Sequence, residues 1–204
     1  MPLALTRRTA LALALAAGTL PGLAFAQGER GPRENAMGSA DAPVTMIDYS
    51  SFTCPHCATF HTQVLPEIKK NYVDTGQVRI IYREVYFDRP GLWAGMIANC
   101  APQDRYFGVV DMLYDKQADW SREATAEDMM AALYSIGRQA GMTDGEMQTC
   151  MGDRDFAEAL VANFQANAEA DGIDATPSFV INGEKVSNMG YEGFVEKLDA
   201  VLAE

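Results

Sequence analysis

The chain has 204 residues, of which 48% are hydrophobic and 22% charged, so it can bury one sizeable core and one inserted subdomain, which excludes a disordered tail or a fibre. Its 16 Lys and Arg residues stand against 28 Asp and Glu residues, which gives a formal net charge of -12 at pH 7. Because binding to phosphate backbones requires a basic surface, we expect no nucleic-acid partner.

Residues 1–26 have the pattern of an export signal. Arg7 and Arg8 are followed by an Ala- and Leu-rich stretch and then by Ala-Phe-Ala at 24–26. The apolar stretch is too short to cross a hydrocarbon core roughly 30 Å thick, so we predict cleavage after Ala26 and a periplasmic protein. The paired arginines also fit a twin-arginine signal, although the general secretory route is the simpler interpretation.

The first part of the exported chain shows the pattern of a βαβ unit. Segment 27–42 has no periodicity and is predicted to be a leader, and 43–50 alternates like a buried strand. From Cys54 the apolar residues follow a helical period, with a kink expected at Pro66. A second strand is predicted at 78–85, so the two strands should be parallel.

The middle of the chain has only helical signals. Five apolar stripes follow one another from residue 90 to residue 170, and no strand pattern interrupts them. Thr125 and Thr143 each precede an acidic residue by three positions, which is typical of a capping box at a helix start. We therefore expect an all-helical segment here.

The last part of the chain returns to β structure. A strand is predicted at 178–182, and an Asn-Gly turn joins it to a second strand at 184–186, before a C-terminal amphipathic helix. The order predicts an α/β fold interrupted by a helical insertion. The expected division is a signal at 1–26, a leader at 27–42, an α/β domain made of 43–88 and 171–204, and a helical insertion at 89–170.

The tetrapeptide Cys54-Pro55-His56-Cys57 lies where the first strand passes to the first helix. Cys54 should therefore sit at a helix N-terminus, where free N–H groups and the helix dipole favour a thiolate, the species that attacks disulfides. The His56 ring can add a donor or a positive charge. Cys57 falls on the apolar stripe and Cys54 does not, so we predict that Cys54 is the exposed nucleophile and Cys57 the buried resolving thiol.

The motif is also compatible with chemistries other than thiol exchange. Zinc needs four ligands and the chain has no second close cysteine pair, but His61 could be a third ligand. A metal-binding module using Cys54, Cys57 and His61 therefore stays open, as does a plain structural disulfide. Haem attachment requires a histidine directly after the second cysteine, where this chain has Ala58.

The block DAPVTMIDYSSFTCPHC, the Thr176-Pro177 pair in ATPSFVING and the helical segment between them resemble the DsbA family of periplasmic thiol-disulfide oxidoreductases. The resemblance extends over residues 38–202 and is most specific at the CPHC motif, whose central dipeptide is typical of the family's oxidases. It implies a thioredoxin fold with an inserted all-helical subdomain, which agrees with the predicted element order. It also implies an enzyme that needs no cofactor or metal.

The resemblance assigns roles to three further residues. Thioredoxin-like proteins carry an acidic residue six positions before the first cysteine, and Asp48 holds that position, where it would accept or relay the proton of Cys57. Pro177 matches the family's cis-proline, which faces the disulfide, and Thr176 would offer backbone groups to an extended substrate. The alternative for Asp48 is an ordinary polar residue at a strand end. The alternative for Pro177 is an ordinary trans proline that opens a strand.

Cys100 and Cys150 lie on two helices of the predicted insertion and have no C-x-x-C spacing. Because an exported protein seldom leaves two thiols unpaired, we predict a structural Cys100–Cys150 disulfide. Closing a loop of about 50 residues stabilises a chain by about 4 kcal/mol in the chain-entropy model. A second redox pair is the alternative.

Together these features predict a monomeric protein-disulfide oxidoreductase. It would donate the Cys54–Cys57 disulfide to reduced exported polypeptides, and the family implies a membrane redox partner that reoxidises the pair. A periplasmic reductase or isomerase is the alternative, because isomerase-type relatives also carry threonine before the proline. Dimeric isomerases have an N-terminal dimerisation domain, whereas 16 residues separate the predicted signal from the first strand here.

Overall fold

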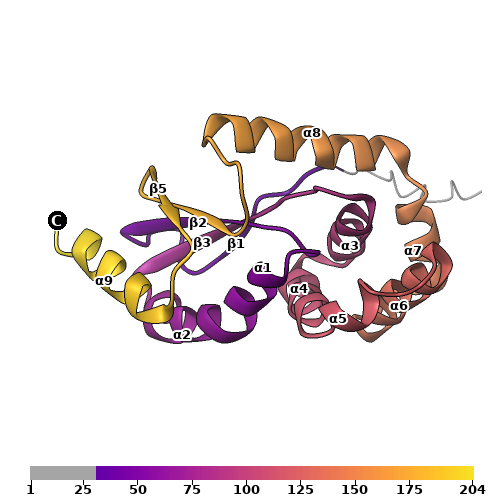
Figure 1. Cartoon of the computed structure of the whole chain (residues 1–204), viewed down its shortest axis with the longest axis horizontal. Coiled ribbons are helices and arrows are strands. Elements are labelled where there is room, and N and C mark those ends of the chain that lie inside the picture. Colours follow the sequence, from indigo (N-terminus) through magenta and orange to yellow (C-terminus); the bar gives the residue numbers. More distant parts are fainter. Residues whose placement is uncertain (1–30) are drawn as a thin grey trace, which may run out of the picture.

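The computed structural model describes residues 31–204, which form a central sheet, helices on both of its faces and a helical part beside it (Figure 1). The predicted export signal lies outside the described residues. The sheet has the strand order β1-β3-β2-β4-β5. Its strands are β1 (Asn35–Met37), β2 (Val44–Ser50), β3 (Val78–Glu84), β4 (Ser178–Ile181) and β5 (Glu184–Ser187).

Strand β2 is at the centre of the sheet and carries the residue beneath the candidate site. It runs parallel to β3 and antiparallel to β4, which places Asp48 opposite Tyr82 and Phe179. Val44 and Met46 on the same strand are fully buried, because β2 has a neighbour on each edge and helices on each face. The parallel pairing of β2 with β3 agrees with the predicted βαβ unit.

Separate apolar clusters cover the two faces of the sheet. On one face Met46 packs with Phe60 of the crossover helix and Phe194 of α9 (Tyr191–Leu202). On the other face Tyr49 packs with Phe164 of α8 (Arg154–Ala170). Figure 1 shows α8 on the opposite side of the sheet from α2 and α9. Because β2 is packed on both faces, its position and direction are fixed. The loop that follows β2 is positioned as a result.

The crossover helix that leaves this loop is irregular. Its consecutive parts are α1 (Pro55–Thr59), the π-helical turn η1 (Phe60–Val64), α2 (Leu65–Ile68) and a second π-helical turn η2 (Lys69–Val73). Pro66, where the sequence predicts a kink, has no N–H to donate to the preceding turn, and η1 ends two residues before it. The π-helical turn matters for the site because it carries His61.

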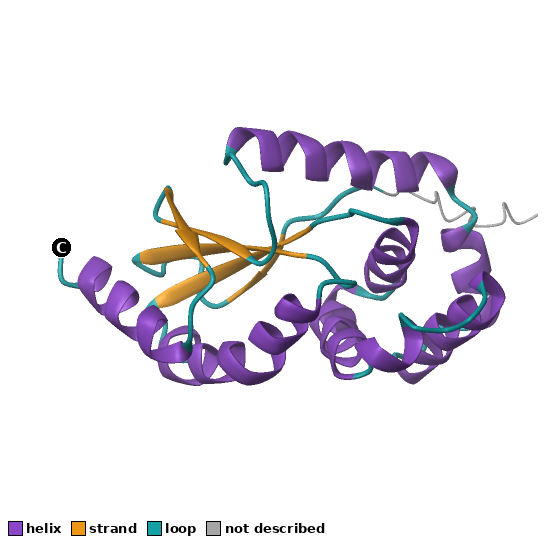
Figure 2. Ribbon diagram, viewed as in Figure 1, coloured by secondary structure: helices purple, strands orange, loops and turns teal. Residues whose placement is uncertain are grey.

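The segment between β3 and β4 contains only helices among the described residues, as its sequence predicts. These helices are α3 (Arg89–Cys100), η3 (Gln103–Arg105), α4 (Tyr106–Asp115), α5 (Gln117–Trp120), α6 (Ala126–Gln139), α7 (Asp144–Met151) and α8. Figure 2 shows α3 to α7 grouped beside the sheet, while α8 returns along it. No helix in the described part of the chain is both long and apolar enough to cross a membrane.

Two short elements differ from the sequence prediction. Strand β1 lies within the segment 27–42, predicted as a leader, and pairs antiparallel with β3. Helix α5 has only four residues. Neither is long enough to show a period in the sequence. At the predicted Asn-Gly turn, Asn182 and Gly183 have φ angles of 45° and 88°, which suit the tight turn between β4 and β5.

Candidate active site

The CPHC motif lies at the junction of β2 and α1. Cys54 is the N-cap of α1 with an extended backbone, and Pro55 occupies the first helical position, where a missing N–H costs nothing. Both cysteines of the motif are free thiols. The Cys54 side chain is half-buried, whereas Cys57, one turn into the helix, is 0% exposed.

Side chains at α3 and α5 hold the loop before Cys54 in place. The amide of Gln117 on α5 donates to the carbonyl oxygens of Phe52 and Cys54, at 2.8 and 3.0 Å. On the other side the Thr53 hydroxyl donates to the Asp88 carboxylate at 2.9 Å, and Asp88 also caps α3. The loop is therefore anchored to both α3 and α5.

The surroundings of Cys54 favour its thiolate. Its pKa is lowered to about 5, first by a hydrogen bond from the Cys57 thiol, against the opposing effect of burial. Hydrogen bonds from the Thr176 side chain and from the backbone N–H groups of Cys57 and His56 lower it further. These backbone donors are among those that a helix leaves without partners at its N-terminus. A thiolate at neutral pH is a nucleophile ready to attack a disulfide.

The second cysteine has the opposite character. Burial raises the pKa of Cys57 well above its ordinary value, and the hydrogen bond to Cys54 and the charge of Asp48 raise it too. The backbone N–H of Ser51 donates to Cys57 Sγ at 3.4 Å and opposes this rise. Cys57 is therefore a protonated thiol when reduced, and it must exchange a proton whenever its bond to Cys54 forms or breaks.

Asp48 lies beneath the cysteines on β2 and is 1% exposed. Ser50 Oγ donates to Asp48 Oδ1 at 2.5 Å, while Oδ2 has no hydrogen-bond partner among residues 31–204. Burial raises the pKa of Asp48 to about 6, although the Ser50 hydrogen bond and the nearby His61 lower it. A carboxyl group with a pKa close to neutral and one open oxygen can take up and release a proton.

The fold brings Thr176 and Pro177 to the cysteines from the far end of the sequence. Their peptide bond is cis, and it directly precedes β4. The Cys54 thiol donates to the Thr176 carbonyl oxygen at 3.5 Å, across 122 positions of sequence. The residues that the sequence analysis assigned to catalysis and to substrate contact therefore meet at one end of the sheet.

The two histidines lie in different surroundings. The exposed His56 acts on Cys54 through its backbone N–H, whereas the sequence analysis assigned the effect to its ring. His61 is buried, and its Nε2 lies 2.8 Å from Asp111 Oδ1. In the described part of the chain, no group of three or more His, Cys, Asp and Glu side chains is placed to hold a metal ion. The alternative set of Cys54, Cys57 and His61 does not form such a group.

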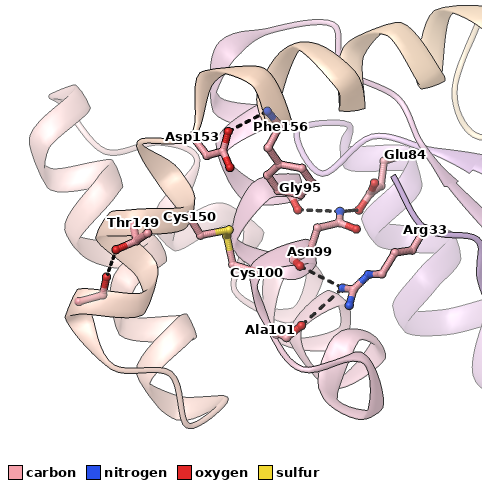
Figure 3. The surroundings of a disulfide bond; sticks show 11 residues. Arg33, Glu84, Gly95, Asn99, Cys100, Ala101, Thr149, Cys150, Asp153 and Phe156 are labelled. Carbon is pink, nitrogen blue, oxygen red and sulfur yellow. Dashed lines mark hydrogen bonds between the residues drawn. A yellow bond between two sulfur atoms is a disulfide. The ribbon is translucent and has the colours of Figure 1, made fainter. Parts of the chain in front are cut away.

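Cys100 and Cys150, which the sequence analysis paired, form a disulfide between α3 and α7 with their Cα atoms 6.0 Å apart (Figure 3). Next to it, the Asn99 amide donates to the Glu84 carboxylate at 2.7 Å. Arg33, from the segment before β1, donates to the carbonyl oxygen of Asn99 at 3.0 Å. The disulfide thus lies in a network that ties the helical part to the end of β3.

Three polar residues of the site were not found from the sequence. These are Ser50, Tyr114 and Gln117. Ser50 had a usable signal, because residues two apart on a strand share a face and it follows Asp48 by two. Tyr114 and Gln117 contact the site only through the folding of the helical part over it, so no local pattern marks them.

The fold and the site together define a class of protein: a thioredoxin-like α/β domain with a helical insertion and a reactive cysteine pair at a helix N-terminus. Residues 31–200 match a family model described as thioredoxin, so the chain belongs to the thioredoxin family.

The chain is similar to several known proteins of this class. A crystal structure of alpha-DsbA1 from Wolbachia pipientis has a TM-score of 0.77 and 27% identity, covering 84% of this chain and 92% of that one. A Rickettsia bellii protein, provisionally named a protein-disulfide oxidoreductase, is 30% identical over 82% of this chain and 64% of its own length. The disulfide bond formation protein D of Bacillus subtilis is 23% identical over 81% of this chain and 76% of its length. The chain thus spans less than two thirds of the Rickettsia relative.

Proposed function

We propose that this protein is a disulfide oxidase, which donates the Cys54–Cys57 disulfide to reduced exported polypeptides. The observation that carries the proposal is the contrast between a half-buried Cys54, whose pKa is lowered to about 5, and a buried Cys57, whose pKa is raised. Stabilising one thiolate stabilises the reduced form, which makes the disulfide a strong oxidant. The names of the relatives support the same chemistry.

The reaction has two exchange steps. A substrate thiolate attacks Cys54 Sγ, the bond between Cys54 and Cys57 breaks, and Cys57 leaves and takes the proton held by Asp48. A second substrate thiolate then attacks the substrate sulfur of the mixed disulfide, and Cys54 leaves as a thiolate. Two substrate thiols are oxidised to one disulfide and the protein disulfide is reduced to two thiols, so the electrons balance.

Thr176 and Pro177 would position the substrate. The Thr176 carbonyl oxygen lies 3.5 Å from Cys54 Sγ, so a backbone that pairs with this segment would bring its own cysteine close to Cys54. An extended chain can pair with such a segment in the manner of an added strand. This pairing uses backbone groups, which suits an enzyme that acts on many sequences.

Each cycle leaves two thiols on the protein, so an oxidant must restore the disulfide. We assign this role to a membrane redox partner and place the cycle in the periplasm, after removal of residues 1–26. The export pattern of the sequence supports this location, since periplasmic conditions favour stable disulfides.

The test uses a peptide with two reduced cysteines and an equimolar amount of oxidised protein. We expect the peptide to become an internal disulfide while Cys54 and Cys57 become alkylatable, as measured by mass spectrometry. The matched control is Cys100→Ala/Cys150→Ala, which keeps the active pair and should oxidise the peptide as the parent does. A peptide that stays reduced, or an oxidised peptide that the reduced protein converts to thiols, would overturn the proposal.

A further inference from the structure

The proton that Cys57 gains and loses has no direct contact with solvent. Cys57 is 0% exposed and Asp48 is 1% exposed, so neither can exchange protons with bulk water through its own surface. When the disulfide is broken, Cys57 takes up one proton, and when the disulfide forms again that proton must leave. A route between Asp48 and solvent is therefore required.

Most neighbours of Asp48 cannot provide that route. The Ser50 hydroxyl occupies Oδ1, and the hydroxyl groups of Tyr82 and Tyr114 lie 2.6 Å apart in the core. Burial raises the pKa of both tyrosines well above 10, so they do not ionise near neutral pH. The remaining neighbour is the imidazole of His61, which lowers the pKa of Asp48 electrostatically.

The two ring nitrogens of His61 have different surroundings. His61 follows Cys57 by one helical turn, and its ring lies 4.6 Å from that of Tyr114. Nδ1 is buried without a hydrogen-bond partner among residues 31–204, like Asp48 Oδ2. Nε2 lies 2.8 Å from Asp111, whose side chain is 65% exposed. An imidazole can accept a proton on one nitrogen and release one from the other.

A groove of about 340 Å³ on the surface reaches this pair. The titratable and charged groups that line the groove or pack against the His61 ring are Asp111, Asp115 and Tyr114 from α4 and Lys69 from η2. Asp48 on β2 is close enough for His61 to lower its pKa. The Asp111 end of the pair is thus open to water, while Nδ1 of His61 is buried next to the ring of Tyr114.

We propose that His61 and Asp111 carry protons between solvent and the buried Asp48. The inference rests on the proposed thiol exchange at Cys54 and Cys57 but not on its physiological direction. When Cys57 leaves Cys54, Asp48 gives it a proton, His61 replaces that proton from the buried Nδ1, and Nε2 regains one from solvent beside Asp111. His61 does not contact the cysteines, so it is a positioning residue that acts through Asp48.

The pH dependence follows from the state of Asp48. With a pKa of about 6, Asp48 already holds a proton in more acidic solution and can protonate Cys57 once without supply from outside. Above that pH it is mostly ionised, and the proton must arrive through His61. A defect in the relay should therefore be large above pH 6 and small below it.

The experiment measures how fast dithiothreitol reduces the oxidised protein, from pH 5 to pH 8.5, in Asp111→Asn and in the control Asp115→Asn. Both aspartates are exposed and line the same groove, but only Asp111 contacts His61. We expect Asp111→Asn to be slower by about tenfold or more above pH 6, as for a lost proton-transfer group, and equal to the parent below it. Asp115→Asn should match the parent throughout.

A second variant separates proton transfer from packing. In His61→Ala, added imidazole should restore the rate above pH 6, whereas pyrrole, a ring of similar size with one nitrogen, should not. Combining His61→Ala with Asp48→Asn should be no slower than Asp48→Asn alone. Equal rates for Asp111→Asn and the parent at every pH, or rescue by pyrrole as well as imidazole, would overturn the relay. Because dithiothreitol needs no physiological partner, either result leaves the test of oxidase activity separate.

Discussion

The two cysteine pairs of this protein are built in opposite ways. Cys54 and Cys57 are three positions apart across a helix start, one half-buried and one fully buried, and both are free thiols. Cys100 and Cys150 are 50 positions apart, lie in the last turns of α3 and α7 and are joined. Position in the fold thus gives each cysteine its chemistry. The N-terminus of a helix stabilises a thiolate, whereas the negative end of the helix dipole at a C-terminus does not.

Each pair also has a carboxylate beside it, and the two carboxylates differ in how many hydrogen bonds they accept. Glu84, near Cys100, accepts hydrogen bonds from Asn99, Tyr86 and Tyr106, all at 2.7 Å. Asp48, near Cys57, accepts one from Ser50 and leaves Oδ2 open. Fully bonded carboxylates fix structure, whereas an open buried oxygen is free to accept a proton.

The largest expected effects are at the active-site pair. Cys54→Ser and Cys57→Ser should both reduce peptide oxidation to the uncatalysed background, because neither variant can form the disulfide that accepts the electrons of the peptide. With glutathione disulfide as the partner the two variants should differ. Cys57→Ser keeps the Cys54 thiolate, which attacks the disulfide, releases one glutathione thiolate and retains the other half as a mixed disulfide, visible as an added mass that a reductant removes. Cys54→Ser should gain no such mass, and an equal added mass on both variants would contradict the division of roles between the cysteines.

Removal of the second pair should act on stability and not on exchange. We expect Cys100→Ala/Cys150→Ala to lower the free energy of unfolding by about 4 kcal/mol, from the entropy of the opened loop, as measured in urea. Peptide oxidation by the folded variant should keep its rate. A strongly slowed oxidation with unchanged stability would make Cys100–Cys150 a second redox pair.

The two carboxylates should separate in kinetics. Asp48→Asn should slow the exchange at neutral pH by about 10²-fold, the effect of losing a proton-transfer group. Glu84→Gln, whose remaining oxygen can keep the hydrogen bonds from Asn99 and Tyr106, should leave the exchange rate unchanged. Stopped-flow measurements on the two variants test this contrast, and similar slowing by both would remove the distinction between them.

Asp48 should also make stability depend on pH. Its folded-state pKa is raised from 3.8 to about 6, so its contribution is fully present below pH 3.8 and is lost as the pH rises through 6. Asp48→Asn should therefore be more stable than the parent at pH 8, by up to about 3 kcal/mol, and the gap should close at pH 4. Denaturation at both values measures it, and a gap that does not change with pH would contradict the raised pKa.

The smallest effect is expected at His56. Its backbone N–H, which lowers the pKa of Cys54, is retained in His56→Leu. We expect the Cys54 thiolate to titrate close to pH 5 in this variant as in the parent, as followed by ultraviolet absorbance. A clear rise in the pKa of Cys54 would show that the His56 ring stabilises the thiolate, as the sequence predicts.

The sequence predicted the features that depend on residues close together in the chain. The periods of β2, the crossover helix and α9, and the position of Cys54 at a helix start, all depend on neighbouring residues. Strand β1 has three residues and no period of its own. Gln117 and Asp111 act on residues more than 45 positions away, so they are found only when the helical part folds over the site. Thr176 was found because a resemblance, not a pattern, pointed to it.

The most direct test of the account is the equilibrium reduction potential of Cys54–Cys57 in glutathione buffers. The parent should be measured beside Cys100→Ala/Cys150→Ala, so that only the first pair contributes to the second curve. A stabilised Cys54 thiolate predicts a strongly oxidising pair, toward about -120 mV as in DsbA, in both proteins. A value near the about -270 mV of thioredoxin would contradict the account and indicate a reductase.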